Sequence, residues 1–306
     1  MATKTKNLMH KNHIRATGSD KITDLVINAF MVIMCIFALY PLWFTFIASI
    51  SHPMYVNRGE IWLLPKDIMF DGYRDLLRNT QLIRGYGNTI FYTVTGTLAQ
   101  LCVIVPTAFV MARPKFPGKY WITIFLMIPM YFGGGMIPSY LLMKDLGLMN
   151  NILIFIIPHG CAYYYVLISK NYFAANIPES LFESARIDGA SITQYFFKFV
   201  IPLSKPIISV LVLYNAIPKW NDYMTSIMYI QDYKKHSLQV VIRAMMETID
   251  PTALDILDKS KQEELLMAQQ LQKYAVVLIG AVPLMLLYPA VQKYLIGGVM
   301  LGAVKE

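Results

Sequence analysis

Residues 177–206 read IPESLFESARIDGASITQYFFKFVIPLSKP, and this stretch decides the fold that we expect. Pro178 stands at the start of a predicted helix that has acidic residues in its first turns, and Gly189 follows its end. A second helix is predicted to begin near Ile192 and to be stopped by Pro202. The stretch therefore predicts a helix, a glycine turn and a second helix, placed between two long apolar runs.

Outward from this stretch, the chain is strongly apolar. Of its 306 residues, 56% are hydrophobic and only 15% are charged, and its mean hydropathy is +0.46. Soluble domains are about 25% charged, so a chain of this length could not cover its surface with polar groups. This composition argues against a soluble enzyme.

Six apolar runs are long enough to cross a membrane, since a hydrocarbon core about 30 Å thick needs about 20 apolar residues in a helix. We predict an all-α integral membrane protein with six transmembrane helices. The expected transmembrane domain is 23–296, with spans at about residues 25–50, 86–112, 120–143, 150–169, 206–230 and 274–296. The remaining segments are the tails 1–22 and 297–306, the loop 177–205 and an outer loop 231–273, which is expected to carry a surface helix from about Thr252 to Lys273.

The distribution of lysine and arginine predicts the orientation in the membrane. The two tails and the alternate connecting segments hold 14 basic and five acidic residues, whereas the opposite set (51–85, 144–149 and 231–273) holds 12 of each. Because cytoplasmic segments are enriched in Lys and Arg, we expect a multi-pass protein of the cell membrane with both termini cytoplasmic. The net charge of +8 is then an orientation signal, and no nucleic-acid partner is expected.

The loop 177–205 resembles the EAA loop of ATP-binding-cassette importer permeases. Glu183-Ser184-Ala185 fills the Glu-Ala-Ala triplet, Gly189 is the glycine, and residues 199–202 fill the Ile-x-Leu-Pro element, with Ser184, Phe199 and Ile201 as modest departures. The string ARIDGAS is typical of the sugar-type branch. The resemblance implies the type I importer fold, in which this loop is the coupling helix that docks on a separate ATPase. The residues implied in coupling are Glu183, Ser184, Ala185, Arg186, Asp188, Gly189 and Pro202. The alternative is a plain amphipathic surface helix.

The end of the chain is similar to the tail of the maltose-type permease, which inserts between the ATPase subunits. The matching residues are Gly302, Ala303, Val304 and Lys305, and an ending at this motif predicts a complete chain that needs a separate ATPase. The sequence contains no GxxxxGK[ST] pattern, so ATP and Mg are expected on the partner ATPase and no cofactor in this subunit. No CxxC or HExxH spacing is present, and we expect neither a metal site nor catalytic residues.

Residues 129–151, together with the outer loop, resemble the branch of these permeases assigned to complex and polymeric saccharides, the YtcP and LplC type. This resemblance implies an oligosaccharide or complex glycan as substrate. It also implies a homologous second permease subunit, an ATPase dimer and an extracellular solute-binding protein as partners, besides membrane lipid.

The fifth predicted span contains the candidate substrate path. Polar groups inside a span are expensive and indicate function by default, and Pro218 is predicted to break the helix, which is tolerable where backbone lines a wet cavity. Aromatic faces with amides and a carboxylate suit a sugar ring. The predicted path residues are Tyr214, Asn215, Trp220, Asn221, Asp222 and Tyr223, with Trp220-Asn221 matching a Trp-Asn element of the family. An internal pair between Lys219 and Asp222 explains the charges about equally well.

Two other functions stay open from the sequence. One is the same machine importing peptides or amino acids. The other is an ion-coupled carrier or a membrane-embedded enzyme, which would not need the ATPase that the loop 177–205 implies.

Overall fold

The computed structural model describes residues 18–114, 116–157, 163–247 and 258–303. These residues are almost entirely helical or in turns, and the only strand-like pairing among them is one antiparallel bridge between Ser51 and Ile68. The predicted all-α fold class is confirmed. The helices are α1 (Gly18–Ser49), α2 (Pro53–Asn57), α3 (Asp71–Arg78), α4 (Thr80–Ala112), α5 (Lys119–Tyr131), α6 (Met136–Asp145), α7 (Leu153–Ile156), α8 (Tyr163–Asn176), α9 (Glu179–Ile187), α10 (Ile192–Tyr195), a π-helical segment (Phe196–Val200), α11 (Ile201–Leu203), α12 (Lys205–Trp220), α13 (Met224–Tyr229), a short 3-10 helix (Tyr233–Lys235), α14 (Leu238–Met246) and α16 (Lys259–Ala303).

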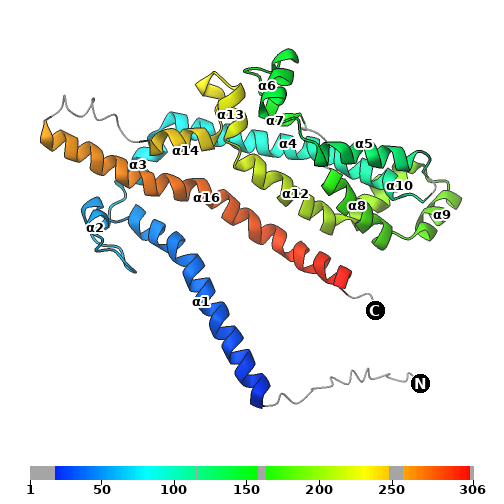
Figure 1. The fold of residues 1–306 in the computed structure, drawn as a ribbon, viewed down its shortest axis with the longest axis horizontal. Helices are drawn as coiled ribbons and strands as arrows, with labels where there is room; N and C mark the ends of the chain where they lie inside the picture. Colours follow the sequence, from blue (N-terminus) through cyan, green and yellow to red (C-terminus); the bar gives the residue numbers. More distant parts are fainter. Residues whose placement is uncertain (1–17, 115, 158–162, 248–257, 304–306) are drawn as a thin grey trace.

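Helix α4 lies at the centre of the packing, because it contacts α8 and α12 along much of its length, and α12 in turn packs on α16. One apolar cluster joins α4, α8 and α12 to α9 and α10, through buried residues such as Phe109, Ala185 and Tyr195. A second cluster joins the other end of α4 to α3, α14 and α16. In Figure 1 the two clusters correspond to opposite ends of the bundle, with α9 and α10 at one end and α3 and α14 at the other.

Helix α1 leaves this bundle at an angle (Figure 1). Only its C-terminal end packs, where Ile47, Ala48 and Ser49 are buried and Phe44 meets Tyr274 of α16 edge-on. Every side chain of α1 from Lys21 to Trp43 is exposed. An apolar surface of this length is suited to lipid or to another apolar helix, and not to water.

Three helices are long and apolar enough to cross a membrane by themselves, at 21–49, 80–112 and 259–286. Two bent pairs raise the count to five: α5 with α6, bent by 115°, and residues 192–203 with α12, bent by 79°. By length and hydropathy the described residues therefore support three to five spans and not the six predicted. The third predicted span, 120–143, is split because residues 132–135, with three glycines in a row, separate α5 from α6.

The fourth predicted span, 150–169, is not one continuous helix in the part of the chain described. Helix α7 has four residues and α8 begins only at Tyr163, while residues 158–162 lie outside the described ranges. The surface helix expected from about Thr252 to Lys273 is helical from Lys259 onward, the part of it that lies in α16, but it does not end before the membrane, because α16 runs without interruption into the sixth span. No glycine or proline stands between Lys259 and Gly280 to stop it.

Candidate functional site

The first helix of the loop 177–205 ends in a hydrogen-bonded glycine turn. The N–H of Gly189 donates to the carbonyl of Arg186 (3.0 Å), and the N–H of Ala190 donates to the carbonyl of Ala185 (2.9 Å). Gly189 has φ +78°, the left-handed conformation that closes this type of helix end and that only glycine adopts without strain. The predicted helix and glycine turn are confirmed.

The second helix begins with a capping box that the sequence interpretation overlooked. Ser191 Oγ accepts from the N–H of Gln194 (3.2 Å), and Gln194 Oε1 accepts from the N–H of Ser191 (2.9 Å). A serine followed three residues later by glutamine is the sequence signature of this motif. The hydrogen bonds on both sides of the turn join near neighbours. The conformation of the corner between α9 and α10 is therefore determined by residues within 10 positions of one another.

Pro202 does not stop the second helix where we predicted it to. The helical path continues through a π-helical segment and Pro202 to Leu203, and the bend toward α12 comes at Ser204. Proline has no N–H to bond the preceding turn. The π-helical segment accommodates this, since the N–H of Ile201 reaches back five residues to the carbonyl of Phe196.

The loop has one buried side and one exposed side. Ala185 and Tyr195 are 5% and 1% exposed and lie in the apolar cluster shared with α4, α8 and α12. The other side presents Ile187, 87% exposed, and Ile192, 64% exposed. The other predicted coupling residues are all exposed: Glu183, Ser184, Arg186, Asp188, Gly189 and Pro202.

Arg113, at the end of α4, joins that helix to α9 and α10. Its guanidinium carbon lies 3.8 Å from the ring centre of Phe182, 4.7 Å from that of Phe109 and 5.2 Å from that of Tyr195. Its Nη1 also pairs with Glu179 Oε2 at 3.1 Å, and its side chain is only 20% exposed. Cation–π contacts of desolvated arginine contribute about 2 kcal/mol, so Arg113 and its three rings form a strong link between the loop and the bundle.

Sequence reasoning used Arg113 only as an orientation charge and did not single out Ile187 or Ile192. An arginine directly before Pro114 at the end of an apolar span was the available signal for Arg113. Nothing in the sequence distinguished Ile187 and Ile192 from buried apolar residues, since their exposure depends on how α9 and α10 pack.

Pro218 does not break the fifth span. Helix α12 continues through Pro218 to Trp220, and the helical path is interrupted afterwards, at 221–223. The proline deprives the Tyr214 carbonyl of its usual N–H donor. The hydroxyl of Tyr165 lies 3.5 Å from that carbonyl, and the two tyrosine rings stack at 6.1 Å, so α8 compensates for the missing bond.

Lys219 points between helices. Its Nζ donates to the backbone carbonyl of Phe155 (3.2 Å), and Gly96 of α4 makes room for both groups. A Cβ on Gly96 would lie 2.6 Å from the Phe155 carbonyl oxygen and 2.9 Å from Lys219 Nζ. Among the ion pairs of the described ranges none joins Lys219 to Asp222, so the pair weighed as an alternative is not a direct salt bridge, although the two charges are close enough to attract each other.

Trp220 and Asn215 are both buried in the structure. Trp220 is 5% exposed, its Nε1 donates to the carbonyl of Gly280 (3.1 Å), and its ring packs against Tyr86. It lines a cavity of about 340 Å³ between α4, α12 and α16 that is almost wholly apolar. Asn215 is buried, and its Nδ2 donates to Leu211 of its own helix.

Tyr223 lies in a different hollow. The guanidinium of Arg243, on α14, sits 4.7 Å above its ring, and the two line a groove of about 390 Å³ together with Gln239, Ile242, Met246 and Glu247. Asp222 Oδ1 accepts from the N–H of Thr225 (3.0 Å), which holds the start of α13, and Asn221 is exposed. The predicted path residues therefore divide among three surroundings and do not line one cavity.

The predicted tail contacts fall at the limit of the described chain. Gly302 and Ala303 are the last two residues of α16, whereas Val304 and Lys305 lie outside the described residues. Within the described ranges, no group of three or more His, Cys, Asp or Glu side chains is placed to hold a metal ion.

Comparison with known proteins adds to this geometry. Residues 86–299 match the family described as "Binding-protein-dependent transport system inner membrane component". The chain is 31% identical to the polygalacturonan/rhamnogalacturonan transport system permease protein YtcP of Bacillus subtilis (strain 168), over 94% of this chain and 99% of that protein. It is 30% identical to Protein LplC of the same organism, over 94% of this chain and 97% of LplC. A solved chain of a bacterial ABC transporter involved in the import of the acidic polysaccharide alginate superposes with a TM-score of 0.81 at 33% identity, covering 91% of this chain and 98% of that one.

Proposed function

The chain belongs to the family of binding-protein-dependent transport system inner membrane components, and from this premise we propose that it is the permease subunit of an ATP-binding-cassette importer for an oligosaccharide or complex glycan. The observation that carries the proposal is the corner formed by α9, Gly189 and α10, which packs against the bundle on one side and exposes Ile187 and Ile192 on the other. The subunit carries out no chemistry. ATP and Mg are bound by a partner ATPase dimer.

The ATPase dimer docks on the exposed side of this corner. Ile187 and Ile192 supply apolar contact area, while Glu183, Arg186 and Asp188 surround it with charge. Exposed apolar groups rimmed by charge favour a protein contact. Movement of the ATPase then passes through Arg113 into α4 and through the bend at Ser204 into α12, as a rigid body.

Both termini and the corner lie on the cytoplasmic side. The Lys and Arg distribution supports this orientation. So does Figure 1, in which α9 lies at the same end of the bundle as the C-terminal end of α16. The residues Gly302 to Lys305 add a second contact with the ATPase. A homologous permease completes the membrane part, and an extracellular solute-binding protein delivers the substrate at the opposite end.

The transported glycan is acidic. Two observations support this substrate class: relatives named for polygalacturonan/rhamnogalacturonan and for alginate, and the groove of Tyr223, Gln239 and Arg243. Its aromatic face suits the C–H face of a sugar, its amide suits hydroxyls, and its guanidinium suits a carboxylate, which arginine binds in bidentate fashion. The groove lies at the end of the molecule opposite the corner, where the substrate would enter.

Uptake by the importer, assembled with its ATPase and solute-binding protein in vesicles, tests the substrate. We expect ATP-dependent uptake of oligogalacturonides over neutral oligosaccharides and over peptides. The variant Arg243→Gln should reduce acidic uptake more than neutral uptake, while Arg58→Gln, an exposed arginine expected on the same side, should change neither. Uptake of peptides alone, or uptake driven by an ion gradient without ATP, would contradict the proposal.

Coupling is tested at Gly189. We expect Gly189→Asp to leave membrane insertion intact and to abolish substrate-stimulated ATP hydrolysis, because it places a charge in the docking surface. The isosteric neutral variant Gly189→Asn is the control, since asparagine tolerates left-handed backbone at least as well as aspartate. Normal stimulation in Gly189→Asp would refute the coupling role of this corner.

A further inference from the structure

An apolar patch lies on the connection between α1 and α3. Trp62, Leu63 and Leu64 are consecutive in the chain and are 71%, 66% and 75% exposed. Ile68 and Phe70, a few residues on, are also exposed. Three consecutive large apolar residues with this exposure are unfavourable in water, which indicates that another apolar surface covers them.

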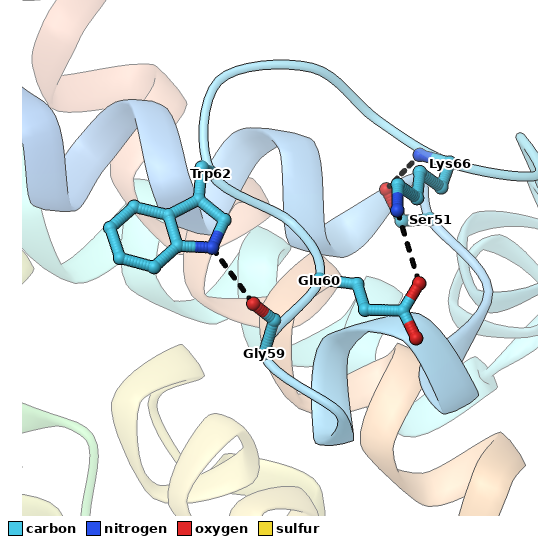
Figure 2. Close-up of polar contacts among 5 residues, drawn as sticks. All are labelled: Ser51, Gly59, Glu60, Trp62 and Lys66. Carbon is cyan, nitrogen blue, oxygen red and sulfur yellow. Dashed lines mark hydrogen bonds and ion pairs between the residues drawn. The ribbon is translucent and has the colours of Figure 1, made fainter.

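The connection is held in a defined shape, so the exposure does not come from a loosely packed loop. Figure 2 shows Trp62 Nε1 donating to the carbonyl of Gly59 (2.9 Å) and Lys66 Nζ paired with Glu60 (3.0 Å). The N–H of Lys66 donates to Ser51 Oγ (3.2 Å), just past the end of α1. The indole of Trp62 and the Lys66–Glu60 pair lie on different sides of the loop (Figure 2).

One hydrogen bond gives the depth of the patch relative to α1. Trp43 Nε1, on α1, donates to the carbonyl of Leu63 (3.0 Å). Trp43 lies six residues before the end of α1 at Ser49, which is about 9 Å along a helix axis. The loop thus folds back beside α1 and does not project beyond it.

Trp43 lies near the C-terminal end of the candidate span 21–49. The chain has no charged residue from Leu25 to Asn57. The distance from Leu25 to Trp43 is about 27 Å at 1.5 Å per residue, close to the hydrocarbon thickness of about 30 Å. Tryptophan is enriched at that boundary, so the carbonyl of Leu63 lies at the level of the lipid headgroups.

We propose that Trp62, Leu63 and Leu64 insert into the lipid leaflet at the C-terminal end of α1, as an interfacial anchor. The patch is continuous with the side chains of α1 that face lipid, through the bond between Trp43 and Leu63. Its charged pair, Lys66 and Glu60, stays on the other side with the headgroups and water. This arrangement of a tryptophan and leucines against paired charges is that of a segment lying in the interface.

The anchor would steady a helix that has little other support. From Lys21 to Trp43, α1 is exposed, and only its C-terminal end is packed against the bundle. A lipid anchor at that same end fixes the angle at which α1 leaves the bundle. A solute-binding protein would instead approach from water beyond Ser49, whereas the patch lies beside the helix. The inference requires that α1 spans the membrane and does not depend on the substrate or on the ATPase.

Depth-dependent fluorescence quenching in vesicles of phosphatidylethanolamine and phosphatidylglycerol tests this inference on the full chain. The environment-sensitive dye NBD is attached at Leu63→Cys in a background in which Cys35, Cys102 and Cys161 are replaced by alanine. Quenching by a nitroxide near the headgroup is compared with quenching by a nitroxide deep in the acyl chain and by aqueous iodide. Matched controls are Arg58→Cys for water and Phe37→Cys, 77% exposed in the middle of α1, for deep lipid.

We expect the label at Leu63 to be quenched most by the shallow nitroxide and little by iodide, with Phe37→Cys favouring the deep nitroxide. Iodide quenching at Leu63 equal to that at Arg58, without quenching by either lipid, would overturn the proposal. Loss of iodide access only after a solute-binding protein is added would also overturn it, in favour of a protein docking site.

Discussion

The corner of α9 and α10 and the polar segment 214–223 contain similar numbers of polar residues, yet they are built differently. In the corner, Gly189 and Ser191 bond to groups within five residues of themselves. In the polar segment, Lys219 bonds to Phe155, 64 residues away, and Trp220 bonds to Gly280, 60 residues away.

This difference explains why one region could be interpreted from sequence and the other could not. Local bonds follow from residue type and spacing, so the motif and its geometry coincide. Long-range bonds depend on which helix packs opposite each face of α12. The residues 214–223 look like one polar cluster in the sequence, but α8, α16 and α14 each take one part of it.

The largest expected effect is at Trp220. Replacement by alanine should destabilise the protein by about 3–5 kcal/mol, because a large buried side chain leaves a cavity. Thermal unfolding in detergent measures this. Trp220→Phe keeps most of the packing but loses the hydrogen bond to Gly280, which should lower the free energy of unfolding by about 1 kcal/mol. If Trp220 instead bound substrate, Trp220→Phe would lose uptake with its unfolding temperature unchanged.

The next effect is expected at Arg113, at the end of α4. The corner of α9 and α10 is closed by local hydrogen bonds, but Arg113 links it to the bundle. Arg113→Ala removes three ring contacts and the ion pair with Glu179, and should lower the free energy of unfolding by about 2–3 kcal/mol. It should also reduce substrate-stimulated ATP hydrolysis. Arg113→Lys keeps the charge but loses the planar stacking, so it should recover only part of the coupling.

The control for Arg113 is Arg74→Ala, which breaks an exposed pair with Asp71 at 3.7 Å and should cost under about 1 kcal/mol. Equal loss of stimulation in Arg74→Ala and Arg113→Ala would show that the ring cage has no special role in coupling.

A smaller effect is expected at Gly96, where α4 admits Lys219. Gly96→Ala places a Cβ 2.6 Å from the Phe155 carbonyl oxygen, and crowding of this kind costs about 1–3 kcal/mol. Gly87→Ala, in the same helix with open space around it, should be neutral or stabilising by up to about 1 kcal/mol. Equal unfolding temperatures for the two variants would contradict the close contact between Lys219, Phe155 and α4.

Several features of the fold could be predicted because they rest on composition or on local pattern. The apolar runs of α1 and α4 predicted membrane helices whose C-terminal ends are close to the observed ones, although the two helices begin seven and six residues earlier than predicted. The helix ends expected at Pro202 and Pro218 fall one and two residues later, at Leu203 and Trp220, because a π-helical segment in one case and a tyrosine of another helix in the other compensate for the missing N–H. Five of the six predicted spans are matched if each bent pair of helices counts as one span, and the sixth, at 150–169, includes residues outside the described ranges.

Residue type and spacing along the chain determined the membrane class, the family resemblance and the closed turn at Gly189, because each depends on hydropathy or on bonds between near neighbours. Tertiary packing alone decided that Arg113 is enclosed by three rings, that Trp220 is buried against Gly280 and that Leu63 lies beside Trp43. These outcomes depend on the approach of segments far apart in the chain, since the burial and partners of a side chain come from the elements that pack against it.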